Sequence, residues 1–429
     1  MKKTFILVLA AFVLLTACSS KSNDQPANES KGKDSKITVW AWDPNFNIAA
    51  MKLAKEAYAT EKPDAKIDLV EYAQADIIQK LNTGLNSGTT SGLPNIVLIE
   101  DYRAQSFLKA YPDAFYDMSS LIKPENFAEY KIAPTSLNGK QYGVPFDSGV
   151  TGLYVRTDYL KEAGYSPEDL MNADWDKFIE VGKAVKAKTG KYMLSLDPND
   201  QGIIRIMIQS AGSWYLKEDG VTPNVKDNAA LKEAFETYKK MMEANIVNVI
   251  SDWSQFLAGF NSGDVASIPT GNWITASVKV EASQSGKWTI VPIPKMKNAT
   301  SSVNASNLGG SSWYVLNVPG KEAAADFLAK TMGSNVELYQ KLVKEIGVIA
   351  TLKEASSGEA YKQGDDFFGG QKTIEDFAKW TQQIPRVNYG MHTYAVDDIL
   401  IAEMQNYLSG GDLDKILADA QSQAEAQLK

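Results

Sequence analysis

The sequence predicts an α/β fold in which strands alternate with helices. Strand-like segments at residues 36–43, 65–71 and 94–101 are rich in apolar and β-branched residues, and the last is a continuous apolar run. Helical patterns at residues 48–60 and 77–84 separate these segments. Strands that alternate with helices in this way build layers around a mostly parallel sheet. Ligands of such sheets lie at the carboxyl ends of the strands.

Two later segments resemble crossings from one α/β unit into another. Residues 139–147 lead into a strand at 152–156, and Gly309-Gly310-Ser311 leads into a strand at 312–317. Because 429 residues exceed what one hydrophobic core usually organises, we expect two or three domains. Further helical patterns lie at residues 173–189, 228–245, 253–261 and 322–332 and from residue 374 to the end, and a short strand lies at 286–294.

The first 35 residues have the pattern of an export signal. Lys2 and Lys3 precede an apolar run of about eleven residues, which is too short to span a bilayer because a span needs about twenty. Cys18, the only cysteine, ends the motif Leu-Thr-Ala-Cys, the lipobox of bacterial lipoproteins. We therefore predict a signal peptide at residues 1–17, lipidation of Cys18 and a flexible tether at residues 18–35. The alternative is a secretory signal with a chance cysteine.

The composition excludes several classes of function. The formal net charge is −8, so the basic face required for nucleic-acid binding is not expected. A single histidine argues against a histidine-rich metal site, and we predict no metal and no cofactor. The chain has no Gly-x-x-x-x-Gly-Lys-Ser/Thr phosphate loop, so any partner that hydrolyses ATP must be a separate chain.

Several short motifs follow one another between residues 36 and 429. They begin with Leu-Pro-Asn-Ile-Val-Leu at 93, Asn-Gly-Lys-Gln-Tyr-Gly-Val-Pro at 138, Gly-Leu-Tyr-Val-Arg-Thr-Asp-Tyr-Leu at 152, Asp-Trp-Asp-Lys-Phe at 174, Phe-Asn-Ser-Gly-Asp-Val-Ala at 260, Gly-Asn-Trp at 271 and Asn-Leu-Gly-Gly-Ser at 307. In this order they resemble the family 1 extracellular solute-binding proteins, which are lipid-anchored receptors of sugar ABC importers in Gram-positive bacteria and are related to maltodextrin-binding proteins. Asn95 departs from the aspartate that this family often has.

The resemblance implies a two-lobed, periplasmic-binding-protein-like fold of type II. Its two α/β lobes are joined by crossing hinge strands, and the ligand cleft lies between the lobes. The N-terminal lobe would comprise residues 36–147 and 312–365, and the C-terminal lobe residues 148–311 and 366–429. The implied protein is a monomer outside the cytoplasm, anchored to the cell membrane by lipid. It would capture a sugar or oligosaccharide by lobe closure and deliver it to ABC permease subunits served by a separate ATPase chain.

Sugar binding requires aromatic rings for the apolar faces of pyranoses and polar groups for the hydroxyls. Trp42 ends the first strand beside the acceptor Asp43, and Trp273 occupies the Gly-x-Trp position that stacks on sugar in maltodextrin binders. The other aromatic candidates for ligand binding are Tyr72, Trp214, Trp313 and Tyr389, and each of them could instead lie in the core. Trp40 and Trp175 are predicted to be structural, and the role of Trp253 stays open.

The polar candidates lie at strand ends and crossings. Asp101 ends a strand and Asp147 lies at the first crossing, so both are predicted hydroxyl acceptors, whereas Glu100 points to the other face of that strand. Arg386 could donate bidentately to a ligand or form a surface salt bridge. Gly310 permits the backbone to approach a ligand closely.

Two alternatives to a sugar receptor stay open. A cell-surface glycoside hydrolase could use Asp43, Asp101 and Asp147 as its acid and base. The same fold could bind a peptide, a polyamine or another small solute. Tryptophans at strand ends favour a sugar, and no catalytic residue is predicted.

Overall fold

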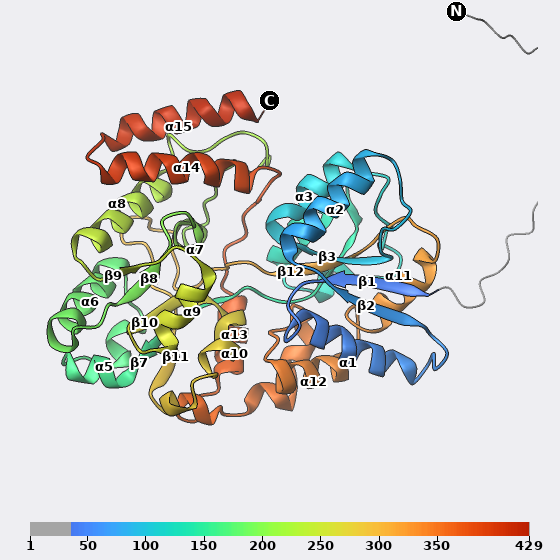
Figure 1. Cartoon of the computed structure of the whole chain (residues 1–429), viewed down its shortest axis with the longest axis horizontal. Helices are drawn as coiled ribbons and strands as arrows, with labels where there is room; N and C mark the ends of the chain where they lie inside the picture. Colours follow the sequence, from blue (N-terminus) through green and yellow to red (C-terminus); the bar gives the residue numbers. More distant parts are fainter. Residues whose placement is uncertain (1–35, 429) are drawn as a thin grey trace, which may run out of the picture. The chain divides into compact units, whose positions relative to one another are not determined.

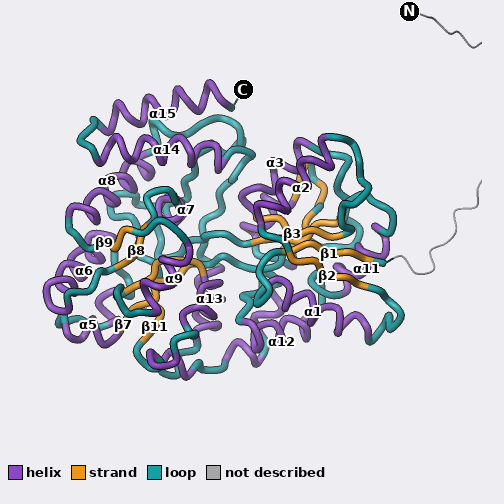
Figure 2. Tube along the Cα trace, viewed as in Figure 1, coloured by secondary structure: helices purple, strands orange, loops and turns teal. Residues whose placement is uncertain are grey.

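The computed structural model describes residues 36–428, so the predicted signal peptide, Cys18 and the tether up to residue 35 lie outside it. The described strands gather mainly in two sheets that are flanked by helices (Figures 1 and 2). One sheet organises each lobe of the two-lobed α/β fold. Within residues 36–428, no helix is long and apolar enough to cross a membrane.

The first lobe contains a five-stranded sheet in the order β2-β1-β3-β12-β6. Its strands are β1 (Ile37–Ala41), β2 (Ile67–Glu71), β3 (Ile96–Glu100), β6 (Gly143–Pro145) and β12 (Ser311–Val315). β1 is parallel to β2 and β3, as predicted, but β12 is antiparallel to both β3 and β6. Ser311, the first residue of β12, pairs with Glu100 at the end of β3, so the chain enters β12 at the carboxyl ends of the parallel strands.

Helices cover both faces of this sheet because its strands are apolar on both sides. Val39, Leu98 and Trp313 face a core formed with α1, α11 and α12, whereas Trp40 and Tyr314 face α2 and α3. Full burial of both faces explains the continuous apolar run in β3. The helices of this lobe are α1 (Asn47–Ala59), α2 (Gln74–Asn86), α3 (Asp101–Ala110), α4 (Ile132–Thr135), α11 (Lys321–Lys330) and α12 (Val336–Ile346), and a small hairpin joins β4 (Ser136–Leu137) and β5 (Lys140–Gln141).

The second lobe contains an antiparallel sheet in the order β10-β7-β11. Leu153 and Val155 face the larger helical layer, and Tyr154 faces the layer that contains α9, α10 and α13. The strands of this lobe are β7 (Thr151–Arg156), β10 (Ser267–Gly271) and β11 (Trp288–Val291), with β8 (Leu194–Leu196) parallel to β9 (Val247–Val249). Its helices are α5 (Thr157–Glu162), α6 (Trp175–Thr189), α7 (Gly202–Ser210), α8 (Ala229–Glu243), α9 (Trp253–Asn261), α10 (Thr275–Val278), α13 (Thr373–Thr381), α14 (Thr393–Leu408) and α15 (Leu413–Gln427).

Extended segments connect the two sheets. The chain passes from β6 to β7 and returns from β11 to β12, and Val150 pairs with Asn307 where these segments run side by side. Gly149 permits this close approach, because a Cβ atom there would lie 2.4 Å from the carbonyl oxygen of Leu308. Asp147 pairs with Ala350, which brings a third segment to the same hinge. The division of the lobes at residues 147, 311 and 365 stays a prediction.

Candidate functional site

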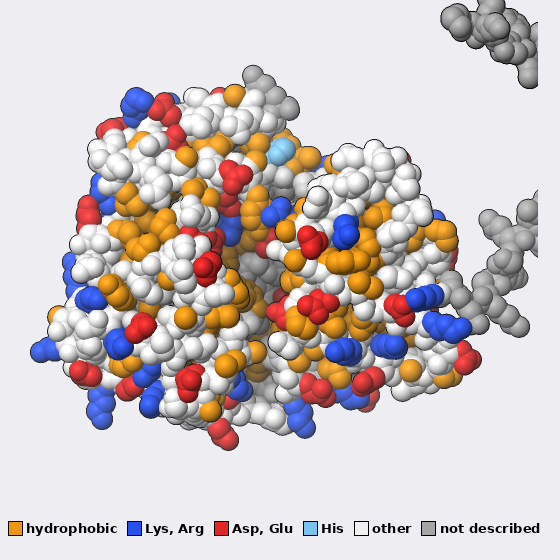
Figure 3. Space-filling model, in the orientation of Figure 1, with side chains coloured by type: hydrophobic (Ala, Val, Ile, Leu, Met, Phe, Trp, Pro, Cys, Tyr) orange, Lys and Arg blue, Asp and Glu red, His pale blue; other side chains and the backbone are white. Residues whose placement is uncertain are grey.

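A cavity of about 560 Å³ lies between the two lobes (Figure 3). Its first wall comes from the carboxyl ends of β1 and β3 and the start of α1, and its second wall from α7, α9 and the segment after β10. Hinge residues 308–311 complete the lining. The volume is within the range of small-molecule sites, and the position follows the rule that ligands lie beyond the carboxyl ends of parallel strands.

A fixed turn presents the first wall. Asp43 has a left-handed backbone, with φ of 57°, and its Oδ1 accepts hydrogen bonds from the backbone N–H groups of Asn45 at 2.9 Å and Phe46 at 3.0 Å. An aspartate tolerates this conformation because its side chain bonds to the backbone that follows. The turn places Trp42, Asp43 and Phe46 at the cavity, with Asn47 behind them at the start of α1.

The second wall carries a group of aromatic side chains. Trp273 donates its Nε1–H to the carbonyl oxygen of Leu308 at 2.9 Å, which fixes the indole beside the hinge. Gly271 is required two residues earlier, because a Cβ atom there would lie 2.2 Å from Nε1 of Trp273. The ring of Trp253 lies next to the ring of Trp273, at a centroid distance of 5.8 Å. The ring of Phe256 lies next to that of Trp253, at a centroid distance of 5.3 Å. The Gly-x-Trp spacing therefore has a steric reason.

The cavity lining is rich in hydrogen-bond acceptors. Its carboxylates belong to Asp43, Glu100, Asp147, Asp197, Asp200 and Asp252. Arg205 is the one Lys or Arg among the described lining residues, and it is paired with Asp397 and, at 3.4 Å, with Asp200. Burial raises the pKa of Asp397 to about 6, although the guanidinium of Arg205 opposes this rise. Within residues 36–428, no cluster of three or more His, Cys, Asp or Glu residues is arranged to hold a metal ion.

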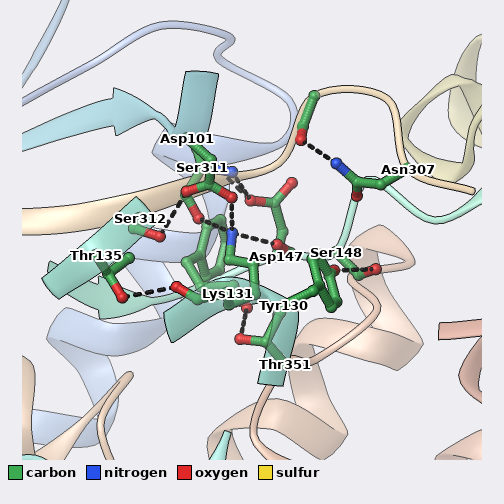
Figure 4. Close-up of polar contacts among 12 residues, drawn as sticks. Asp101, Tyr130, Lys131, Thr135, Asp147, Ser148, Asn307, Ser311, Ser312 and Thr351 are labelled. Carbon is green, nitrogen blue, oxygen red and sulfur yellow. Dashed lines mark hydrogen bonds and ion pairs between the residues drawn. The ribbon is translucent and has the colours of Figure 1, made fainter. Parts of the chain in front are cut away.

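A buried ion pair supports the hinge next to the cavity (Figure 4). Nζ of Lys131 lies 2.5 Å from Oδ2 of Asp101 and donates to the carbonyl oxygens of Asp147 and Ser311, each at 2.9 Å. Asp147 accepts hydrogen bonds from the backbone N–H and the hydroxyl of Ser311, each at 2.7 Å. Burial raises the pKa of Asp101 to about 6, although Lys131 lowers it. The lysine thus joins α3 to two of the hinge segments.

The start of α3 inserts into the second lobe. The ring of Tyr102 contacts Tyr389 at a centroid distance of 4.6 Å and Trp214 at 5.4 Å. Its hydroxyl accepts from the backbone N–H of Gly309 at 3.2 Å. Next to it, the hydroxyl of Tyr394 donates to Oε2 of Glu100 at 2.5 Å. Through these contacts, the aromatic side chain of Tyr102 connects the two lobes at the edge of the cavity.

The structure brings five of the predicted site residues together at the cavity. Both lobes and the hinge contribute to this group, which consists of Trp42, Asp43, Asp147, Trp273 and Gly310. Trp42 and Trp273 are partly exposed, as a stacking platform must be, whereas Asp147 is 4% exposed and already accepts two hydrogen bonds. That these residues bind a ligand stays a prediction.

Three aromatic side chains that were predicted to contact the ligand lie in the protein interior instead. Trp313 is fully buried because β12 lies between β3 and β6, and its ring faces the core beside Phe146 at 5.6 Å. Trp214 and Tyr389 are each 2% exposed and form the pocket that receives Tyr102. The placement of these three side chains in the cleft was wrong, and their contacts assign them to packing.

Three further candidates also lie away from the cavity lining. Asp101 is 1% exposed because α3 begins at this residue and directs its carboxylate to Lys131. Tyr72 follows the outermost strand and packs edge-on against Trp40 at 5.1 Å. Arg386 has a side chain that is 64% exposed, and its nearest carboxylate, that of Glu129, is 3.7 Å away. The structure therefore places these three residues outside the cavity lining, although the sequence analysis had expected them to contact the ligand.

Several cavity residues were missed by the sequence analysis. Glu100 was assigned to the opposite face of its strand, but it lines the cavity and Asp101 does not. Arg205 lies on α7 and Tyr102 lies on α3, and neither residue was a candidate for the site. Trp253, whose role was open, lines the cavity at the start of α9. The sequence did offer a signal for Trp253, because Asp252 is a typical residue to cap a helix and Trp253 directly follows it.

Comparison with known proteins gives consistent matches along most of the chain. Residues 53–369 match the model of a family described as bacterial extracellular solute-binding protein. A lactose-binding protein of Rhizobium radiobacter is 48% identical over 394 residues, which cover 92% of this chain and 93% of the relative. An arabinooligosaccharide-binding protein of Bacillus subtilis is 28% identical over 362 residues, covering 81% of this chain and 80% of the relative.

The fold also matches solved structures. One is the galacto-N-biose-/lacto-N-biose I-binding protein of the ABC transporter from Bifidobacterium longum, in complex with lacto-N-biose. It superposes with a TM-score of 0.74 and 20% sequence identity, covering 92% of this chain and 98% of that structure. At this identity the similarity establishes the two-lobed fold and not the ligand.

Proposed function

Because the chain belongs to the bacterial extracellular solute-binding protein family, we propose that it captures a saccharide between its lobes and delivers it to the permease of an ABC importer. The ATPase of that importer is a separate chain. The observation that carries this proposal is the cavity itself, whose lining combines partly exposed Trp42 and Trp273 from different lobes with several carboxylates. Aromatic faces and hydroxyl acceptors are the two kinds of partner that a sugar requires.

A lactose-type disaccharide is the first candidate ligand. The relative from Rhizobium radiobacter that is 48% identical along nearly the whole chain is a lactose-binding protein, which supports this choice. In the proposed complex, Trp42 and Trp273 stack on sugar rings and Asp43 and Glu100 accept hydroxyl protons. The acidic lining disfavours an anionic saccharide, because like charges repel most strongly where water is excluded.

Lobe closure is the proposed response to binding. The two aromatic walls lie on different lobes, so a saccharide that contacts both stabilises the closed arrangement relative to the open one. A ligand shifts such an equilibrium only through its different contacts in the two states. The cargo is released chemically intact, and the protein acts as a monomeric receptor.

We predict binding without turnover. The purified chain from residue 36 onward is titrated calorimetrically with lactose, maltose and an arabinose disaccharide, and the recovered sugar is then analysed by chromatography. We expect one site, a negative heat-capacity change from burial of apolar surface and unaltered sugar. Shortened products that increase with protein concentration would support the glycoside hydrolase instead. Binding of a peptide or a polyamine in the absence of any sugar binding would support the alternative solute.

The proposed anchor is the lipidated thiol of Cys18. The lipobox before this residue carries the assignment, which would keep the receptor outside the cytoplasm and next to the permease. We expect Cys18→Ala to abolish incorporation of labelled palmitate and to release the protein into the medium or leave its signal uncleaved. The matched variant Ser19→Ala should retain the label. Continued labelling of Cys18→Ala would contradict the anchor.

A further inference from the structure

A tyrosine of the second lobe contacts two charged side chains of the first lobe beside the cavity. Tyr394, in the first turn of α14, donates its hydroxyl hydrogen to Oε2 of Glu100, the last residue of β3, at 2.5 Å. The guanidinium carbon of Arg103 lies 3.7 Å from the centroid of the Tyr394 ring. Nε of Arg103 is also 3.7 Å from the same Glu100 oxygen. These three side chains therefore form one cluster that joins the lobes, which we call the clasp.

The second lobe fixes the position of Tyr394 without help from the first. Asp397, one turn further along α14, is paired with Arg205 on α7. The hydroxyl of Thr393, directly before Tyr394, accepts a hydrogen bond from Nε1 of Trp214 at 3.1 Å. Because its neighbours on α14 are held in this way, the phenol points to Glu100 without the large ordering cost that a free side chain would have.

The clasp lies on the cavity side of the hinge. Glu100 and Arg205 line the cavity, whereas Tyr394 and Arg103 lie outside its lining. Tyr102 is bonded to the hinge itself, through the backbone N–H of Gly309, and it therefore lies close to the axis about which the lobes would move. Tyr394 is bonded to the first lobe instead. Separation of the lobes on the cavity side must therefore break the clasp.

The clasp contacts favour the closed arrangement in the absence of any ligand. A hydrogen bond to an ionised carboxylate is stronger than one between neutral groups, and a guanidinium is attracted to an aromatic ring face. The side chains of Arg103 and Glu100 are only 30% and 16% exposed, so water weakens these interactions less than it would at an open surface.

We infer that the clasp holds the two lobes together before a ligand binds, and that Tyr394 raises the affinity without contacting the ligand. The apparent affinity of a receptor is its intrinsic affinity multiplied by the fraction of molecules already in the binding-competent arrangement. Because Tyr394 bonds to one carboxylate oxygen of Glu100, the other oxygen can accept a sugar hydroxyl. The effect on affinity rests on the proposed saccharide binding, whereas the closure of the ligand-free protein does not depend on the cargo.

The test measures the dimensions of the protein and its affinity in matched variants. Small-angle X-ray scattering of the purified chain gives the radius of gyration of the wild type, Tyr394→Phe, Tyr394→Ala and Tyr58→Phe, without sugar and with saturating lactose. Calorimetry gives the affinities for lactose and maltose. Tyr58→Phe is the control, because the hydroxyl of Tyr58 donates to Oδ2 of Asp326 at 2.7 Å and both residues lie in the first lobe.

We expect the ligand-free wild type to have the same radius of gyration as the lactose complex. Ligand-free Tyr394→Phe should be more expanded, and lactose should return it to the wild-type value. Loss of a hydrogen bond to a charged acceptor should lower the ratio of closed to open molecules at least about tenfold. Lactose and maltose should both bind this variant about three- to tenfold more weakly, by the same factor within about twofold. Tyr394→Ala should show larger changes, and Tyr58→Phe should behave as wild type.

Three outcomes would overturn the clasp. A ligand-free wild type that contracts on lactose binding as much as Tyr394→Phe does would show that the contact does not hold the lobes together. Weaker binding by Tyr394 variants of unchanged dimensions would show that the phenol acts on Glu100 alone. Clearly unequal losses for lactose and maltose would show that Tyr394 contacts the ligand. A wild type that binds neither sugar would overturn the proposed function, whereas expansion of ligand-free Tyr394→Phe would still support the clasp.

Discussion

Trp273→Ala is expected to weaken saccharide binding at least about thirtyfold, a loss of roughly 2 kcal/mol or more, as is common when a central aromatic anchor is truncated. The indole lies beside the hinge, where its Nε1–H is already bonded to the carbonyl oxygen of Leu308. Its ring face is therefore available for stacking while its polar edge is satisfied. No water molecule can replace the apolar platform that the substitution removes. Titration calorimetry on the folded variant measures the effect.

Two comparison variants separate a binding role from a folding role. Trp42→Ala, on the facing wall, should weaken binding nearly as much as Trp273→Ala. Trp175 is 2% exposed and packs edge-on against Phe178 at 5.3 Å, so Trp175→Ala should lower the melting temperature and leave the affinity of the folded fraction unchanged. A folded Trp273→Ala protein with wild-type affinity would show that the sugar does not stack on this ring.

Local patterns were sufficient to predict most of the first lobe. Alternating apolar segments and helical periodicity located β1, β3 and α1 to within a few residues, because each of these elements has a strong local preference. The direction of β12 was not predictable in this way. Its antiparallel pairing follows from where the returning chain enters the sheet, which is a property of the whole topology.

The site was harder to predict because depth and facing direction are three-dimensional properties. Trp313 and Trp273 both follow glycines near strands, yet a central strand buries Trp313 while Trp273 lies beyond the end of β10 at the cavity. Glu100 and Asp101 exchanged their expected roles because α3 begins directly after β3, without an intervening loop. A one-residue difference at a strand end reverses which carboxylate faces the cavity.

Arg205 was missed for a different reason. All nine residues of α7 are buried, and these include the polar residues Arg205, Gln209 and Ser210, which a helical pattern alone would place on a solvent-exposed face. Its ion pair with Asp397 joins α7 to α14, segments that are 192 positions apart in the chain. Neither the burial of this arginine nor its partner is encoded in a local pattern.

Lys131→Met should lower the free energy of unfolding by about 3–5 kcal/mol near pH 8, the usual cost of removing one partner of a buried ion pair. The side chains of Lys131 and Asp101 are 0% and 1% exposed. Methionine fills a similar volume but leaves the carboxylate of Asp101 without its counter-charge. Two carbonyl oxygens of the hinge, those of Asp147 and Ser311, also lose their hydrogen-bond donor. Guanidinium denaturation followed by circular dichroism measures the change.

The decrease in the free energy of unfolding caused by Lys131→Met should become smaller as the pH falls. Burial already raises the pKa of Asp101 from 3.8 to about 6, and Lys131 opposes that rise, so its removal raises the pKa further. A carboxyl group whose pKa is higher in the folded state takes up a proton on folding. Its stabilising contribution is present below the unfolded pKa and is lost as the pH rises through the folded pKa. The difference between Lys131→Met and wild type should therefore be smaller at pH 5 than at pH 8.

Two matched variants make this result specific to the buried pair. Lys131→Met combined with Asp101→Asn removes the unpaired charge and should recover part of the stability at pH 8, with a weaker pH dependence. Lys140→Met removes an exposed pair with Asp117, where the lysine side chain is 56% exposed, and should change the free energy of unfolding far less than Lys131→Met does. A Lys131→Met protein that is equally destabilised at both pH values would show that the lost hinge hydrogen bonds, and not the unpaired carboxylate, determine the effect.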